Sequence, residues 1–194
     1  MTETSPLVDP VVTKAKFDRE IARFRENADD HARNGCWLAK AEYPKALVIF
    51  GTPRLKPPVV AFGAAFDFTN YDLWPPSVRL VDPFTQVPYK ARELPTPLPR
   101  RLQGAGEQPA PGVEVAIARL AQWYGLDDLP FICLPGVREY HDHPGHSGDS
   151  WLLRRGTDEG TLHSLVTHLY HYGTEYLSAF HLGIIGLMPS EIPA

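Results

Sequence analysis

The stretch VVAFGAAFDF, residues 59–68, decides the fold class because it alternates large and small residues, as a strand with one packed face does. Three shorter runs with strand character lie on either side of it, separated by turn residues. They are residues 37–42, ALVIF at 46–50, and SVRLV at 77–81. Four consecutive strands with short connections predict an antiparallel meander.

Helical patterns lie on both sides of the meander. Asp9-Pro10 is a good helix start, and apolar residues that recur on one face predict a helix over about 11–33. A second amphipathic helix is predicted to begin near Thr161, and a shorter one over about 113–124. Residues 83–112 are rich in proline and predict a long loop or surface insertion. The sequence therefore predicts an α+β fold.

Length and composition limit the classes of function. A chain of 194 residues is expected to form one domain over 1–194. The net charge of -4 supplies no basic footprint, so neither a nucleic acid nor an anionic membrane is expected as partner. No apolar run reaches the ~18 residues of a membrane helix, and residues 1–10 lack signal-peptide features, so the cytoplasm is the expected compartment.

The chemistry is concentrated in CLPGVREYHDHPGHSGDSW, residues 133–151. Thiolate, imidazole and carboxylate are the ligands that zinc prefers, and five candidates fall within fourteen residues. They are Cys133, Glu139, His141, His143 and His146. In an extended chain, residues 139, 141 and 143 would project to one side. Four bound ligands would make a closed structural site, and three would leave an open catalytic one.

Other interpretations of the same residues compete with a metal site. A solvated polar loop would use its histidines to cap turns and bond the backbone. A triad of Ser150, His143 and Asp149 is a weaker hypothesis, because nothing resembling a nucleophile elbow surrounds the serine. His168, His171 and Glu175 have metal-compatible helical spacing but are predicted on the solvent face of the last helix.

The order of elements resembles the ubiquitin-conjugating (UBC) fold: a helix, a four-strand meander, a His-Pro segment and closing helices. YDLWPPSVRLVDP, residues 71–83, is similar to the "YP…PP.V.F..P" passage of that superfamily. HPGHSGDSWLL, residues 143–153, is similar to its "HPN…G..CL.." passage, which carries the catalytic cysteine. The resemblance implies a UBC-like domain with N-terminal helix, four-stranded antiparallel meander and C-terminal helices.

Two departures from the superfamily pattern bear on activity. Trp151 takes the position of the catalytic cysteine, and Gly145 takes that of the asparagine after His-Pro. The thioester nucleophile and the group that stabilises its oxyanion are both absent. The expectation is a protein without ordinary conjugating activity.

A bacterial UBC-like family that lacks the catalytic cysteine is a closer resemblance. It is encoded with ubiquitin-like proteins, activating enzymes and JAB-type isopeptidases, and is expected to bind metal through one Cys, one Glu and two His. Cys133, Glu139 and two of His141, His143 and His146 fit that order, with His141 and His146 favoured. The resemblance implies a zinc-binding adaptor for a ubiquitin-like protein or its activating enzyme. Trp74, Trp151 and the 83–112 segment are the contact candidates, because exposed aromatic residues often anchor interfaces. The alternative is a metal-dependent hydrolase with an open zinc position and Glu139 or Asp149 as general base.

Overall fold

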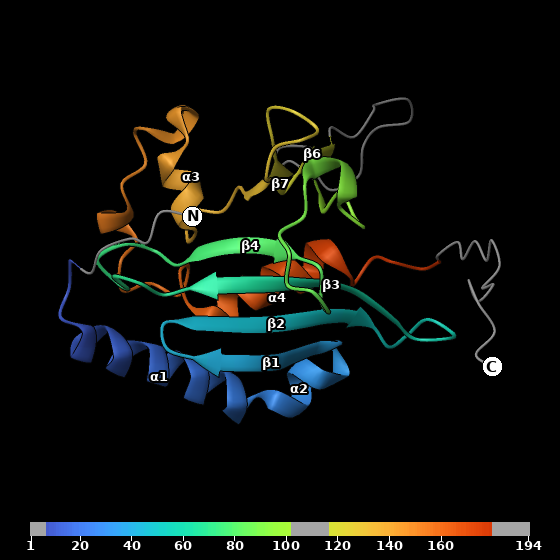
Figure 1. The fold of residues 1–194 in the computed structure, drawn as a ribbon, viewed down its shortest axis with the longest axis horizontal. Helices are drawn as coiled ribbons and strands as arrows, with labels where there is room; N and C mark the ends of the chain where they lie inside the picture. Colours follow the sequence, from blue (N-terminus) through green and yellow to red (C-terminus); the bar gives the residue numbers. More distant parts are fainter. Residues whose placement is uncertain (1–6, 102–116, 180–194) are drawn as a thin grey trace, which may run out of the picture.

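The computed structural model describes residues 7–101 and 117–179, and these form a mixed α+β structure around one four-stranded antiparallel sheet (Figure 1). The strand order is β1-β2-β3-β4, so each strand pairs with its neighbour in sequence. The predicted meander is confirmed, with ends within two residues of those expected. The strands are β1 (Cys36–Glu42), β2 (Lys45–Thr52), β3 (Val59–Asp67) and β4 (Ser77–Val81).

One face of this sheet is buried along all four strands. Strand alternation places Phe50 opposite Phe62 and Val48 opposite Ala64, and all four side chains are buried. The other face carries Trp37, opposite Ile49 and partly exposed. The sheet therefore has a single core-facing side, and the helices must pack there.

The N-terminal helical segment divides into α1 (Pro10–Glu26) and α2 (Ala28–Arg33), where the sequence predicted one helix over 11–33. The Asp9 carboxylate caps α1 by accepting from the Val11 N–H at 2.8 Å. The two helices are separated at Asn27, whose side-chain amide donates to the Arg23 carbonyl at 2.9 Å. A side-chain bond of this kind competes with the backbone hydrogen bonds that would continue the helix. The apolar stripe of α1 is buried as predicted: Phe17, Ile21 and Phe24.

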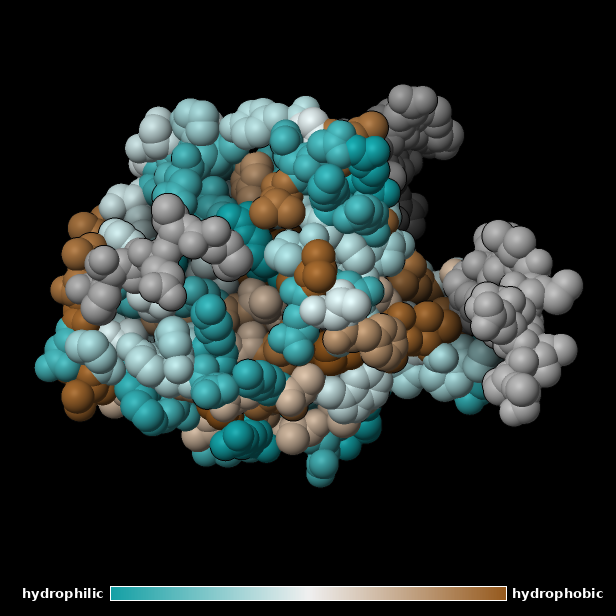
Figure 2. All heavy atoms as spheres, viewed as in Figure 1, coloured by the Kyte–Doolittle hydropathy of each residue, from teal (hydrophilic) through white to brown (hydrophobic). Residues whose placement is uncertain are grey.

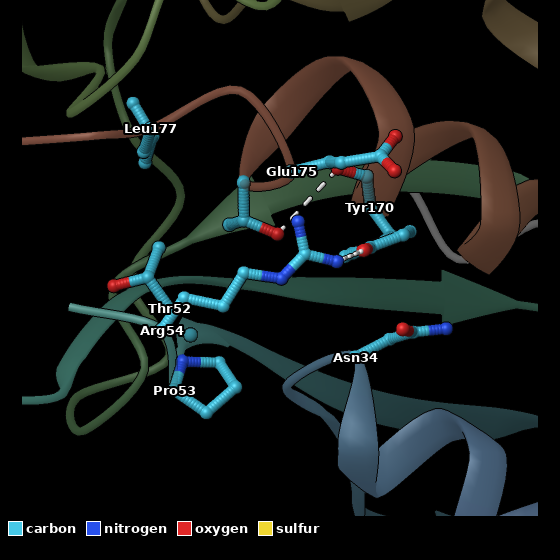
Figure 3. A pocket seen from close by; sticks show the side chains of 9 residues that line it. Asn34, Thr52, Pro53, Arg54, Tyr170, Glu175 and Leu177 are labelled. Carbon is cyan, nitrogen blue, oxygen red and sulfur yellow. Dashed lines mark hydrogen bonds between the residues drawn. The ribbon is translucent and has the colours of Figure 1, made fainter.

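The closing helix α4 (Leu162–Gly173) begins where the sequence predicted, with the Thr161 hydroxyl accepting from the Ser164 N–H at 3.2 Å. It lies behind the sheet in Figure 1 and contacts α1. Its buried residues Leu162, Leu165, Val166 and Leu169 complete the core. At its C-terminal end the Arg54 guanidinium, from the loop after β2, donates to the Tyr170 hydroxyl at 2.7 Å (Figure 3).

The described residues between β4 and α4 contain more secondary structure than their composition predicted. It contains a short 3-10 helix, η1 (Ala91–Glu93), and two small sheets. Strands β5 (Pro99–Arg101) and β6 (Ile117–Arg119) pair in one, and β7 (Ala121–Gln122) and β8 (Phe131–Ile132) in the other. The prediction of a helix over 113–124 is wrong for residues 117–124, because Ile117–Arg119 pair with β5, Ala121–Gln122 pair with β8, and the others are not helical. Residues 113–116, and 102–112 of the predicted 83–112 insertion, lie outside the described residues.

Three short helices follow β8: α3 (Arg138–Asp142), η2 (Pro144–His146) and η3 (Trp151–Leu153). In Figure 1 this segment lies above the β4 edge of the sheet, and α3 contacts both β4 and β8.

Hydrophilic residues cover much of the face shown in Figure 2, with apolar residues in separate groups between them. Within residues 7–101 and 117–179, no helix has the length and apolarity to cross a bilayer.

We expect stability to fall with acidification through His31, which joins α2 to α4. Its ring is buried, stacks on Phe24 at 4.1 Å and lies 3.4 Å (Nε2 to Nδ1) from His163. Burial and the neighbouring His163 lower the pKa of His31, so the unfolded chain binds its proton more readily than the folded one. The contribution is complete above the unfolded pKa, near 6.5, and is lost as pH falls towards the folded value.

Thermal melts of wild type and His31→Gln between pH 5 and pH 8 will measure this contribution. The melting temperature of the variant should depend less on pH than that of wild type. The control is His171→Gln, which removes an exposed histidine from α4, the helix that His31 contacts. An equal change in both variants would contradict the assignment to His31.

Candidate functional site

The helical conformation of α3 separates residues that an extended chain would align. Residues 139–143 were expected to be extended if they bound metal together, but Arg138–Asp142 is helical. In a helix, positions two apart point about 200° from each other. Glu139 and His141 therefore leave α3 on different sides and reach different partners.

Glu139 connects α3 to the start of β4. Its carboxylate accepts from the Ser77 hydroxyl and from the Val78 N–H at 3.2 Å, and it pairs with the Arg79 guanidinium at 3.2 Å. The side chain is nearly buried in this position. A carboxylate with three donors of the protein is already satisfied, so the structure gives Glu139 a role in holding α3 against the sheet.

Both ring nitrogens of His141 face backbone carbonyls. Nδ1 lies 2.9 Å from the Asp149 oxygen, and Nε2 lies 2.6 Å from the Pro135 oxygen. A metal needs a ring nitrogen that points at the ion, and both nitrogens of His141 point at backbone oxygens instead. In this arrangement His141 bridges the turn after β8 to the loop before η3.

Cys133 and His146 are the two candidates that meet directly. The Cys133 thiol, at the end of β8, lies 3.6 Å from Nε2 of His146, in the short helix η2. Zn–S and Zn–N bonds of about 2.3 and 2.0–2.1 Å at a tetrahedral angle place the two ligand atoms about 3.6 Å apart. The observed separation equals that edge, and it also fits a hydrogen bond between the two groups.

The environment of this pair keeps both groups neutral. Burial raises the pKa of the Cys133 thiol, although Arg100 nearby acts in the opposite direction. Burial and the neighbouring His143 lower the pKa of His146. A nucleophilic cysteine needs the reverse, a thiolate beside an imidazolium. A neutral imidazole beside a thiol that can lose its proton suits a metal ligand pair instead.

His143 is the nearest further histidine, with its ring 5.3 Å from that of His146. It stacks between Tyr124 and Phe131, at centroid distances of 5.5 and 5.0 Å. Its Nδ1 accepts from the Gly145 N–H at 3.1 Å, which is the structural bond expected of a histidine before proline. A metal held by His143 would therefore take its other nitrogen, Nε2.

Asp149 organises the loop that carries His146. Its carboxylate accepts two bonds from Arg154, at 2.8 and 2.9 Å, and one from the Tyr140 hydroxyl at 2.8 Å. These bonds lower the pKa of Asp149, the arginine first and the tyrosine second. Arg154 also binds Glu159 at 2.8 Å, and the Tyr140 ring stacks on His146 at 3.9 Å. This network fixes His146 in front of Cys133.

The Ser150, His143 and Asp149 triad is not assembled. The Ser150 hydroxyl caps η3 by accepting from the Leu152 N–H at 3.3 Å, while His143 bonds Gly145 and Asp149 bonds Arg154. Each of the three side chains therefore has a different structural partner. Of the candidates at the end of the chain, His171 pairs with Glu175, but His168 bonds the Ser164 carbonyl at 2.8 Å, so the three do not meet.

Within the described part of the chain, no group of three or more His, Cys, Asp or Glu side chains converges as ligands around a metal would. The five candidates divide into a pair at ligand separation, Cys133 and His146, a neighbour, His143, and two that hold backbone or strand, Glu139 and His141. The donor chemistry of the pair fits zinc, and the complete set of four is not brought together.

Trp151 is buried, with 7% of its surface exposed, and was expected to be an exposed contact residue. Its indole N–H donates to the Asp72 carbonyl at 2.9 Å. A side chain at Gly160 would bring its Cβ within 2.5 Å of the indole ring, so the ring requires glycine there. The expectation that Trp151 anchors a partner is wrong, because the ring is packed inside the protein.

The aromatic residues around the histidines and the role of Arg154 were not predicted from the sequence. Tyr140 and Tyr124 stack on His146 and His143, and no local spacing joins Tyr124 to residues nineteen or more positions later. The Asp149–Arg154 spacing of five was a visible signal, because oppositely charged residues that flank a short helix often pair.

The fold and the site define a small α+β domain with a Cys–His pair beside its four-stranded sheet. Residues 8–177 match the Y4jH family, described as Y4jH-like, and the chain belongs to that family. It is similar to the "Uncharacterized protein y4jH" of Sinorhizobium fredii (strain NBRC 101917 / NGR234), with 46% identity over 174 residues. That alignment covers 86% of this chain and 84% of the relative.

Replacing Glu139 by alanine should lower the free energy of unfolding by about 1–3 kcal/mol, because donors on β4 lose their acceptor. The loss should be the same with and without a chelator, since the carboxylate bonds the protein itself. Denaturant unfolding measures both values. The matched control is Glu42→Ala, an exposed carboxylate paired with Lys40, which should change the value by less than about 0.5 kcal/mol. A loss that disappears in chelator would make Glu139 a metal ligand.

Proposed function

We propose that this chain is a UBC-like domain that does not conjugate and that acts as an adaptor in a bacterial ubiquitin-like modification system. The observation that carries the proposal is the burial of Trp151, the residue that the sequence resemblance aligns with the nucleophile of the UBC superfamily. The order of α1, the β1–β4 meander and α4 supports the UBC-like assignment.

Trp151 is incompatible with thioester transfer for two reasons. An indole is not a nucleophile for this reaction. The indole N–H of Trp151 also donates to the Asp72 carbonyl, and the ring packs against Gly160. Cys133 does not replace it, because its thiol is buried and its pKa is raised. A buried neutral thiol reacts poorly with an activated carboxyl group.

The proposal includes a divalent metal, with zinc favoured, held by Cys133 and His146, with His143 Nε2 as the candidate for a third ligand. When bound, the ion would supply a cross-link between β8 and the loop before η3. Such a cross-link contributes folding free energy, because the ligands meet only in the folded chain. The residues of this site position the loop: Tyr140 holds the His146 ring, and Asp149 with Arg154 holds the backbone around it.

The surface that this loop presents supports an adaptor role. Leu152 and Leu153 follow the buried Trp151 in η3 and are 64% and 82% exposed. The Ser150 cap and the Arg154 ion pairs fix the backbone on both sides of them. Two apolar side chains on a fixed turn lose little entropy on binding, so they are suited to contact a ubiquitin-like protein or its activating enzyme.

The geometry favours the adaptor over a metal-dependent hydrolase. A hydrolase of that kind needs a carboxylate near the ion as general base. Both sequence candidates are occupied: Glu139 by donors on β4, and Asp149 by Arg154 and Tyr140.

Cobalt(II) titration of untagged protein tests the metal. We expect saturation near one ion per chain, with a thiolate-to-cobalt charge-transfer absorption that Cys133→Ser abolishes. Cys36→Ser is the matched control, since Cys36 is also buried but its thiol lies against the Asn34 carbonyl. His146→Gln should weaken binding by at least about tenfold, and His171→Gln should not. Absence of the band in wild type, or its survival in Cys133→Ser, would remove the metal.

A conjugation and binding assay tests the adaptor. With a bacterial ubiquitin-like protein, its activating enzyme and ATP, we expect no thiol-sensitive adduct on a non-reducing gel. Calorimetry should show binding to one of the two proteins, weakened by more than about tenfold in Leu152→Asp/Leu153→Asp. Val11→Asp, which changes an exposed apolar residue on α1, is the control. An adduct on Cys133 would overturn the inactive assignment, and no binding to either protein would overturn the adaptor.

A further inference from the structure

A cavity of about 250 Å³ lies beside Trp151, outside the Cys133–His146 site. Residues of α1, of the segment after β3 and of the loop before α4 line it, and five of them define its chemistry: Arg19, Glu20, Arg23, Tyr71 and Trp151. By contrast, the hollow beside Arg54 in Figure 3 has only about 10 Å³, the space of a single water. The larger cavity has room for a small organic molecule.

The Glu20 carboxylate forms the inner end of the cavity, since the side chain is only 3% exposed. Its Oε2 accepts from the Leu162 N–H at 3.2 Å. Among residues 7–101 and 117–179, the contacts of its Oε1 are long, 3.4 Å to the Tyr71 hydroxyl and 3.8 Å to the Arg19 guanidinium. Hydrogen bonds to a carboxylate are normally 2.5–2.9 Å. Oε1 therefore retains the capacity to accept a strong bond from a ligand.

The walls next to Glu20 are aromatic. Tyr71 and Trp151 both line the cavity and are almost fully buried, so their rings are held in place. A carboxylate beside aromatic rings is the arrangement that recognises an ammonium group, through a charge-assisted hydrogen bond and the ring quadrupoles. The inner half of the cavity is thus complementary to an organic cation.

The outer half of the cavity is lined by positive charges. Arg19 and Arg23 line it with side chains that are 69% and 47% exposed, so they lie at the rim. Arg23 pairs with the exposed Asp158 at 3.3 Å, a contact that solvent screens. Asp72 is already neutralised by Lys16 at 2.6 Å and Arg155 at 3.1 Å. The two rim guanidiniums are therefore placed to bind a carboxylate.

We propose that this cavity binds a small zwitterion of amino-acid size, with its ammonium group on Glu20 and its carboxylate at Arg19 and Arg23. The volume is slightly below the range of about 300–1,000 Å³ that is typical of pockets for drug-sized ligands, so it suits a smaller molecule. Burial raises the pKa of Glu20, so the ligand competes with a proton for the carboxylate. Binding weakens as the pH falls through that pKa.

The test uses ω-amino acids from glycine to 6-aminohexanoate, with n-butylamine and butyrate as one-ended analogues. Tryptophan fluorescence reports occupancy because Trp151 lines the cavity. One member of the series should saturate the signal at least about tenfold more tightly than either one-ended analogue, which corresponds to about 1.4 kcal/mol.

Two variants separate the ends of the ligand. Glu20→Gln keeps an oxygen for the Leu162 N–H but removes the charge, and it should abolish the preference for an ammonium group. Arg19→Gln/Arg23→Gln changes only exposed rim residues, so it folds, and it should abolish the preference for a carboxylate. Arg25→Gln, an exposed residue of α1 outside the cavity lining, is the control.

Failure of the whole series to saturate wild type would overturn the proposal, as would equal binding by wild type and the rim variant. Equal binding by wild type and Glu20→Gln would also overturn it. These outcomes are independent of the cobalt and adduct experiments, because no residue of the cavity belongs to the Cys133–His146 site.

Discussion

The structure depends on one constraint: a four-stranded sheet with a single apolar face must bury that face under two helices from opposite ends of the chain. Phe17 of α1 packs edge-on against Phe68 at 5.5 Å, and the apolar stripe of α4 joins the same cluster. Glu20 connects the two helices through the Leu162 N–H. A buried carboxylate is costly unless it is bonded, so this contact fixes how α1 and the start of α4 meet.

The segment between β4 and α4 is attached to the sheet region by two side chains, Trp151 and Glu139. The indole bonds the Asp72 carbonyl, and the carboxylate bonds the start of β4. Both are held by contacts to the sheet region and not by each other. Along the chain, His146 lies between these two attachment points, and Cys133 comes shortly before the first. The Cys133 thiol and the His146 ring are thus carried by backbone that these contacts hold against the sheet region.

The sequence predicted the meander, the first helix and the start of α4 because their signals are local. Alternation along VVAFGAAFDF and the caps at Asp9 and Thr161 are written in adjacent residues. The strands β5 to β8 have two or three residues each, and only a distant partner makes them strands. The helix α3 was missed for the same reason, since Arg138 binds the Thr69 and Pro75 carbonyls from across the chain. The candidate site was predicted in composition and only partly in geometry, because helical α3 turns Glu139 and His141 away from each other.

Trp151, which is buried in the fold, also lines the cavity, so one residue takes part in both proposals. If Trp151 stands where a UBC nucleophile would, a side chain of that size fills space that a cysteine leaves open. Its ring is accommodated by the absence of a side chain at Gly160. The cavity beside it is also lined by Arg19 and Glu20 of α1. Under that alignment, the same ring takes the place of the nucleophile and forms one wall of the cavity.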